Sequence, residues 1–134
     1  MTVLYVASDE EGAGKTALCA TLADKIRQRG VKAAVFKPLA GAGQDPGSDP
    51  DVQVYHKLLG QRAEGWPLKL SGRGLTRALL EGISTAFKVV SEGADAVLVE
   101  GSCDLSAKQS QRVADALDAK IVVVARYGHD LSAS

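Results

Sequence analysis

The chain has 134 residues, 46% apolar and 24% charged, and its 16 basic residues are balanced by 16 acidic ones. This size allows one domain with one hydrophobic core. Because the net charge is zero and the basic residues form no stripe, we expect no nucleic-acid partner. We expect neither a membrane-spanning helix, which needs roughly 20 apolar residues, nor a secretory signal. The two cysteines have no metal-ligand spacing, which predicts a reduced, cytoplasmic protein.

Short apolar runs alternate with helical patterns along the first part of the chain. Residues 2–7 (TVLYVA) are β-branched and aromatic, which is typical of a buried strand. In residues 16–29, Leu18, Leu22 and Ile26 recur at every fourth position, which predicts a helix with these side chains on one face. A second strand is predicted at 31–36, and a loop rich in Gly, Pro and Asp follows over 37–50.

The same alternation continues to the last residues. We predict a short helix at 51–59, an irregular stretch at 61–74 in which Trp66 fills the core, and a long helix at 75–91. A strand at 95–99, a helix at 109–117 and a strand at 120–125 complete the pattern.

The order of these elements predicts an α/β fold. Strands alternate with helices and are continuously apolar, which is typical of an open, mostly parallel sheet with helices on both faces. Residues 1–134 are predicted to form one such domain. Because the chain ends about nine residues after the fourth strand, we expect a truncated form of this fold, as a fragment or as a part of a larger protein.

A phosphate-binding loop (P-loop) is predicted between the first strand and the first helix, at residues 9–16 (DEEGAGKT). Backbone amides and the positive end of the helix dipole hold phosphates in such a loop. Lys15 would place its charge between the phosphates, and the Thr16 hydroxyl would hold Mg²⁺. The alternative is a glycine-rich turn with a chance Lys-Thr, since Asp9 replaces the usual first glycine. The predicted nucleotide-binding residues are Gly12, Ala13, Gly14, Lys15, Thr16 and Ala17.

Charged side chains follow two other strands at the same edge of the predicted sheet. Glu100 ends the third strand, where ligands of open α/β sheets bind, so it is predicted to hold Mg²⁺ opposite Thr16; the alternative is a glutamate turned to solvent. Lys37 ends the second strand and would neutralise a phosphate or carboxylate, or else be a solvated lysine. Asp49 and Asp51 fit the N-terminal cap of the next helix, and both could also reach a cation.

Three segments resemble the dethiobiotin synthetase family. Residues 6–16 (VASDEEGAGKT) are similar to that family's TGTDTEVGKT type of loop. Residues 35–40 (VFKPLA) resemble its Lys-Pro-Val segment, and residues 97–101 (VLVEG) resemble its Val-Glu-Gly segment. The matches come in the family's order and span nearly the whole chain. The same domain type occurs at the N-terminus of some phosphotransacetylases and in cobyrinic acid amide synthetases.

The resemblance implies a P-loop NTPase-like domain that uses ATP and Mg²⁺ and forms a homodimer. Dethiobiotin synthetase carbamates a diamine, phosphorylates the carbamate with ATP, and closes a ureido ring as the second amine displaces phosphate. On this chain the resemblance implies Lys15 and Lys37 as catalytic residues, with Lys37 near the carbamate. It implies Thr16, Glu100 and Asp51 as the ligands of Mg²⁺.

The segments expected at the substrate depart from the family pattern. Ser8 stands at the leading glycine of the loop, residues 41–42 are Gly-Ala where the family has Ser-Gly, and residues 102–104 are Ser-Cys-Asp where it has Ala-Gly-Gly. Side chains at Cys103 and Asp104 would obstruct the close approach of a substrate to the backbone that glycines allow. The leading hypothesis is therefore an ATP- and Mg²⁺-binding module with a nucleotide-sensing or regulatory role, or a part of a larger enzyme. The alternative is an ATP-dependent carboxylate or carbamate ligase.

Overall fold

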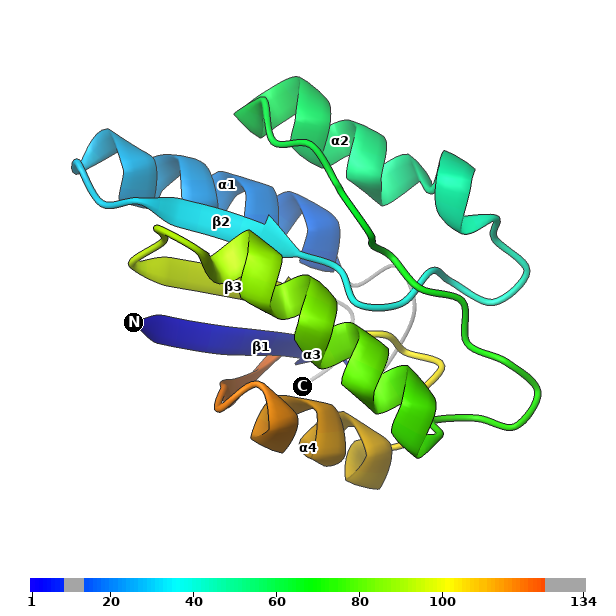
Figure 1. Ribbon diagram of the computed structural model, residues 1–134. Coiled ribbons are helices and arrows are strands. Elements are labelled where there is room, and N and C mark those ends of the chain that lie inside the picture. The colour runs from blue at the N-terminus through cyan, green and yellow to red at the C-terminus, as the bar shows by residue number, and fades with distance from the viewer. Residues whose placement is uncertain (9–13, 125–134) are drawn as a thin grey trace, which may run out of the picture.

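The computed structural model describes residues 1–8 and 14–124 (Figure 1). In chain order the elements are β1 (Thr2–Ser8), α1 (Lys15–Gln28), β2 (Ala33–Phe36), the 3₁₀ helix η1 (Pro46–Ser48), α2 (Pro50–Leu59), α3 (Arg77–Ser91), β3 (Ala96–Glu100), α4 (Ala107–Ala116) and β4 (Lys120–Val124). The predicted alternation of strands and helices is confirmed. The long helix α3 begins two residues later than expected because Thr76 is its N-cap, with its hydroxyl accepting from the Leu79 amide.

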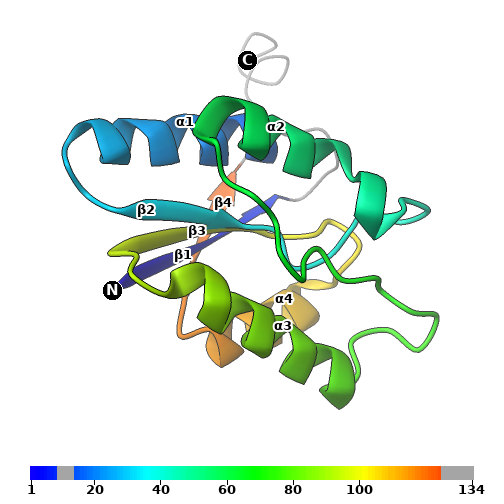
Figure 2. The same cartoon turned by 45° about the horizontal axis from the view of Figure 1, so that its top comes forward.

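The four strands form one parallel sheet in the order β2-β3-β1-β4. Central strand β1 aligns Val3 with Val97 of β3 and Tyr5 with Ile121 of β4. Helices α1 and α2 cover one face of the sheet, and α3 and α4 cover the other (Figure 2). This arrangement confirms the predicted α/β fold. Because all strands are parallel, their carboxyl ends lie at one edge of the sheet.

The hydrophobic core lies on both faces of the central strands. All five residues of β3 are buried, as expected for a strand covered by helices on each side. The ring of Trp66 packs edge-on against Phe36, with ring centroids 5.6 Å apart, which confirms the expected core role of this tryptophan. Phe36 also packs against Phe87 of α3, with ring centroids 5.8 Å apart, and Ile83 of the same helix is buried.

The buried face of α1 is rotated from the one expected. Cys19, Ala20 and Ala23 are its buried residues, whereas Leu18 is 40% exposed. Leu22 and Ile26 are only partly buried against the core. Small side chains at the centre of the interface let the helix lie close to the sheet, so the larger apolar residues lie at its flanks. The four-residue spacing correctly predicted the helix, but the prediction that Leu18 lies on its buried face is wrong.

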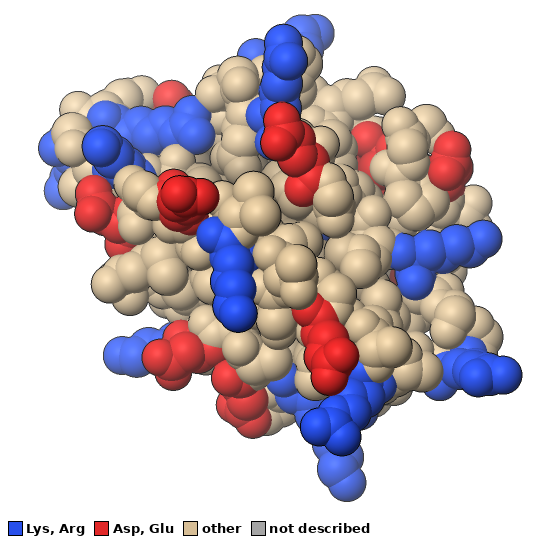
Figure 3. Space-filling model, in the orientation of Figure 1, with Lys and Arg blue, Asp and Glu red and all other residues tan. Residues whose placement is uncertain are grey.

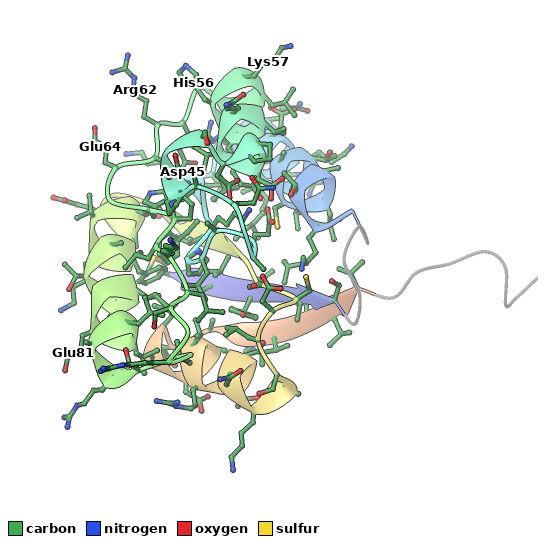
Figure 4. All side chains as sticks on the ribbon, turned by 90° about the vertical axis from the view of Figure 1, so that its right-hand side faces the viewer. Asp45, His56, Lys57, Arg62, Glu64 and Glu81 are labelled. Carbon is green, nitrogen blue, oxygen red and sulfur yellow. The ribbon has the colours of Figure 1, made fainter. Side chains whose placement is uncertain are left out.

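Charged side chains are spread over the surface without a block of one sign on the face shown in Figure 3. His56 and Lys57 of α2 and Glu81 of α3 are exposed and point away from the sheet (Figure 4). None of the helices formed by the described residues is long and apolar enough to cross a membrane.

Candidate functional site

A cavity of about 510 Å³ lies at the carboxyl edge of the sheet. Its lining comes from the start of α1 (14–17), the segment after β2 (37–44), the first turn of α2, and residues 100–104 after β3. The volume is within the range of about 300–1,000 Å³ found for small-molecule sites. Four segments from different parts of the chain therefore meet around one cavity. The predicted binding residues Gly12 and Ala13 lie outside the described residues.

Helix α1 directs its N-terminus at this cavity. Gly14 is the N-cap residue with φ 82°, a left-handed conformation that favours glycine. Glycine has no side chain to cap the first amides of the helix, and Lys15, Thr16 and Ala17 all line the cavity. The positive end of the helix dipole is therefore at the position where the sequence predicts phosphate binding.

Glu100 is buried in the lining of the cavity. It ends β3 beside Val6 of β1 and is only 5% exposed. The Thr16 hydroxyl donates a hydrogen bond to Glu100 Oε1 over 2.9 Å, and the Tyr55 hydroxyl donates to the same oxygen. The alternative of a glutamate turned to solvent is therefore wrong.

Lys37 forms a buried cluster with two aspartates of α2. Its ammonium nitrogen lies 2.8 Å from Asp49 Oδ2 and 2.6 Å from Asp51 Oδ2. The Lys37 residue is 7% exposed, so it is not a solvated lysine. Burial alone would lower its pKa, but hydrogen bonds to Asp49 and Asp51 outweigh burial and raise it.

Asp49 anchors the start of α2. Its side chain is fully buried and also accepts hydrogen bonds from the Asp51 and Val52 amides, which makes it the N-cap. The predicted capping role is confirmed for Asp49, whereas Asp51 lies in the first turn. The Asp49 carboxylate therefore serves the helix amides and Lys37, and its side chain has no exposed surface.

The three predicted metal ligands lie around one part of the cavity. Asp51 joins Thr16 and Glu100 there, and all three line it. Burial would raise the pKa of Asp51, but Lys37, with a smaller contribution from Thr16, holds it below its usual value. Within residues 1–8 and 14–124, no group of three or more His, Cys, Asp or Glu side chains could hold a metal ion.

Cys103 and Asp104 line the cavity at positions where the resemblance leads us to expect glycines. Asp104 Oδ2 accepts a hydrogen bond from the Ala42 amide over 2.8 Å, which joins the loop after β2 to the loop after β3. Cys103 is exposed. At Gly101 an added Cβ would lie 2.6 Å from Tyr5 Cε1, so any side chain there would require the buried Tyr5 ring to move.

Tyr55 is the site residue that sequence reasoning missed. It is fully buried in the middle of α2, where an aromatic side chain has the pattern of a core residue. Its spacing of four from Asp51 was the available signal, since it places both side chains on one helical face. Burial, followed by the Glu100 carboxylate, raises the pKa of Tyr55, so the phenol remains a donor.

Together, the parallel sheet, the strand order and the helix N-terminus at the sheet edge define an α/β domain of the P-loop NTPase-like class. A family model described as an AAA domain matches residues 2–133. The chain belongs to this family, and the relatives found fit the dethiobiotin synthetase-like P-loop family that the sequence resembles.

Two curated relatives are similar in sequence. Phosphate acetyltransferase of Nitrosomonas europaea is 31% identical over 138 residues, which cover 92% of this chain and 19% of the relative. ATP-dependent dethiobiotin synthetase BioD of Rhodococcus jostii is 31% identical over 144 residues, covering 96% of this chain and 62% of the relative. The chain thus spans less than two thirds of either relative.

A solved structure shares the fold. Cobyrinic acid a,c-diamide synthase from Mycobacterium smegmatis, crystallised with an ATP analog and magnesium, matches with a TM-score of 0.54. The match covers 92% of this chain and 59% of that chain at 19% identity, and it shows the common architecture.

The burial of Glu100 predicts a pH-dependent stability in the absence of ligand. Burial, with the nearby Asp51 carboxylate, raises the pKa of Glu100 from 4.5 to about 7, although Tyr55, Lys37 and Thr16 oppose the shift. A group with a raised pKa stabilises the fold below its unfolded pKa and loses that contribution as the pH rises through its folded pKa. At about 1.36 kcal/mol per pH unit, the loss between pH 4.5 and 7 is at most about 3 kcal/mol.

Thermal unfolding at pH 5, 6.5 and 8 with a chelator present checks this prediction. We expect the wild-type protein to lose stability over this range relative to Glu100→Gln, which is neutral throughout and keeps an oxygen that can accept from Thr16 and Tyr55. Parallel stability curves for the two proteins would contradict the raised pKa.

Proposed function

We propose that the chain binds a nucleoside triphosphate together with Mg²⁺ in the cavity at the sheet edge. In this proposal it acts as a nucleotide-sensing or regulatory module, or as the nucleotide-binding part of a larger enzyme. The observation that carries the proposal is one of geometry: the open N-terminus of α1 and three oxygen-bearing side chains meet in one cavity of suitable volume.

Each residue has a role that its chemistry fits. Lys15 provides a point charge for the β- and γ-phosphates, and the first amides of α1 add hydrogen bonds. The hydroxyl of Thr16 and the carboxylates of Asp51 and Glu100 are hard oxygen donors of the kind that Mg²⁺ prefers. Because the described residues hold no three-acid cluster, Mg²⁺ would share its coordination with phosphate oxygens and water.

The relatives support a nucleotide as the ligand. The Rhodococcus jostii relative is named as ATP-dependent, and the Mycobacterium smegmatis structure contains an ATP analog and magnesium. A homodimer and a cytoplasmic location are further parts of the proposal. They rest on the family resemblance and on the absence of a metal or disulfide pattern at the cysteines.

A second candidate function is an ATP-dependent carboxylate or carbamate ligase. It is favoured by Lys37, which lies in the same cavity as Lys15 and could hold an anionic substrate. In the present arrangement, however, Asp49 and Asp51 neutralise Lys37, and a substrate would have to displace one of them. The hydrogen bond from the Ala42 amide to the Asp104 side chain also occupies the part of the cavity where the substrate is expected. We therefore favour the module over the ligase.

Isothermal titration calorimetry with ATP, GTP and inorganic triphosphate, each with and without Mg²⁺, tests nucleotide binding. We expect saturable binding of at least one nucleoside triphosphate, at least about tenfold tighter with Mg²⁺. The absence of binding to every member of the panel would contradict the proposal.

An activity assay separates the two functions. The protein is supplied with ATP, Mg²⁺, bicarbonate and the dethiobiotin precursor diamine, and ADP and ureido product are measured. We expect no diamine-dependent product. Formation at an ordinary enzyme rate of about 1 per second, or even a hundredth of that, would establish the ligase instead.

A further inference from the structure

Tyr55 contributes a fully buried hydroxyl to the wall between α1, α2 and β3. It is 0% exposed and follows Asp51 by one helical turn on the same face of α2. The hydroxyl donates its hydrogen to Glu100 Oε1, on a strand 45 residues further along the chain. None of the roles assigned above to phosphate or metal requires this residue.

The hydroxyl is not needed to fill the core. A buried phenol loses its hydrogen bonds to water, and this loss is offset only by a partner inside the protein. Phenylalanine would fill nearly the same volume without that requirement. The partner of Tyr55 is one of the three side chains around the predicted metal position, so the hydroxyl bears on the geometry of the site.

Two donors converge on one oxygen of Glu100. Oε1 accepts from both Thr16 and Tyr55, which restricts rotation of the carboxylate about its last bond. Thr16 is itself a proposed metal ligand, whereas Tyr55 contacts Glu100 from the helix layer and lies outside the cavity lining. Tyr55 can therefore hold the carboxylate in one orientation while the cavity side of the site exchanges ligands.

We propose that Tyr55 is a positioning residue that fixes the Glu100 carboxylate for binding Mg²⁺ with the nucleotide. The inference rests on the proposed function and extends it to a residue that does not touch the ligand. A hydrogen-bonding partner of a metal ligand commonly changes metal affinity by 10- to 100-fold. The alternative is that Tyr55 only packs α2 against β3.

Tyr55→Phe tests the proposal, because it removes the hydroxyl and keeps the ring. The nucleotide that wild type binds is titrated by calorimetry with and without Mg²⁺. We expect the gain in affinity from Mg²⁺ to fall by at least about tenfold in the variant, while metal-free nucleotide affinity stays within about twofold of wild type. Thr85→Val is the control for loss of a hydroxyl, since Thr85 is exposed on α3, donates to the Glu81 carbonyl and does not line the cavity.

A cycle with Glu100→Gln asks whether Tyr55 acts through Glu100. In that background we expect Tyr55→Phe to cause no further loss of the Mg²⁺ effect. The cycle remains informative if Tyr55→Phe alone fails to fold. Without the Tyr55 hydroxyl, the buried Glu100 carboxylate loses a hydrogen-bond donor, and Glu100→Gln removes the charge that needs this donor. A further loss in the double variant would contradict the proposal.

The remaining outcomes separate this inference from the proposed function. If wild type gains affinity from Mg²⁺ and Tyr55→Phe gains equally, Tyr55 is only a packing residue and the inference fails alone. The inference also fails if Thr85→Val reduces the Mg²⁺ effect as much as Tyr55→Phe does. If wild type binds no nucleotide or gains nothing from Mg²⁺, the proposed function fails and this inference fails with it.

Discussion

Replacing Asp49 with alanine is expected to lower the free energy of unfolding by about 3 kcal/mol, the lower end of the range for breaking a buried ion pair. The change removes the fully buried partner of Lys37 and leaves its ammonium with Asp51, whose side chain is 30% exposed. It also removes the N-cap of α2, which is typically worth about 1 kcal/mol. Chemical denaturation at neutral pH measures the change.

Asp49→Asn is the matched control. Asparagine is a good N-cap residue and keeps an oxygen for the Asp51 and Val52 amides, but it carries no charge for Lys37. We expect this variant to be less stable than wild type and more stable than Asp49→Ala. If both variants unfold at the wild-type denaturant concentration, the buried cluster does not hold α2 in place.

Lys15→Ala is expected to weaken binding of the Mg²⁺–nucleotide complex by at least about tenfold, or 1.4 kcal/mol. Lys15 is the only basic residue in the loop sequence 9–16, which also contains Asp9, Glu10 and Glu11. Its charge is therefore the main one in the loop that can offset a triphosphate. Calorimetry with the nucleotide that binds wild type most tightly measures the effect.

Lys25→Ala is the matched control for this change. Lys25 lies on the same helix, is exposed and is absent from the cavity lining. Its replacement by alanine lowers the net charge of the protein by the same amount as Lys15→Ala. We expect its nucleotide affinity to stay within about twofold of wild type, since exposed charges are screened by salt. Unchanged affinity in Lys15→Ala would remove the P-loop assignment, whatever the control shows.

Sequence patterns predicted most of the fold because they depend on local physics. Apolar β-branched runs such as residues 2–7 and 95–99 form strands, and capping or stopping residues such as Thr76 and Gly60 mark the helix ends. The face of α1 was predicted less well, because the choice between Leu18 and Ala23 depends on how closely the helix approaches the sheet.

The candidate site was predicted as a set of positions rather than as a set of contacts. Parallel strands place their carboxyl ends at one edge, so Lys37 and Glu100 could be assigned to the same side of the sheet from the order of elements. The sequence could not decide whether Lys37 was solvated or Glu100 turned outward. Both alternatives are wrong, because α2 packs beside Lys37 and Glu100 and buries their side chains.

By itself the sequence determined the order of strands and helices, the family, and the side chains that gather at one edge of the sheet, since these follow from periodicity, spacing and chain order. Only the tertiary structure decided that Asp49 holds Lys37 and that Tyr55 holds Glu100. These pairs are separated by 12 and 45 residues. The position of α2 over the sheet brings them together, and burial makes an unpaired charge or hydroxyl costly, so each finds its partner only once the layers have packed.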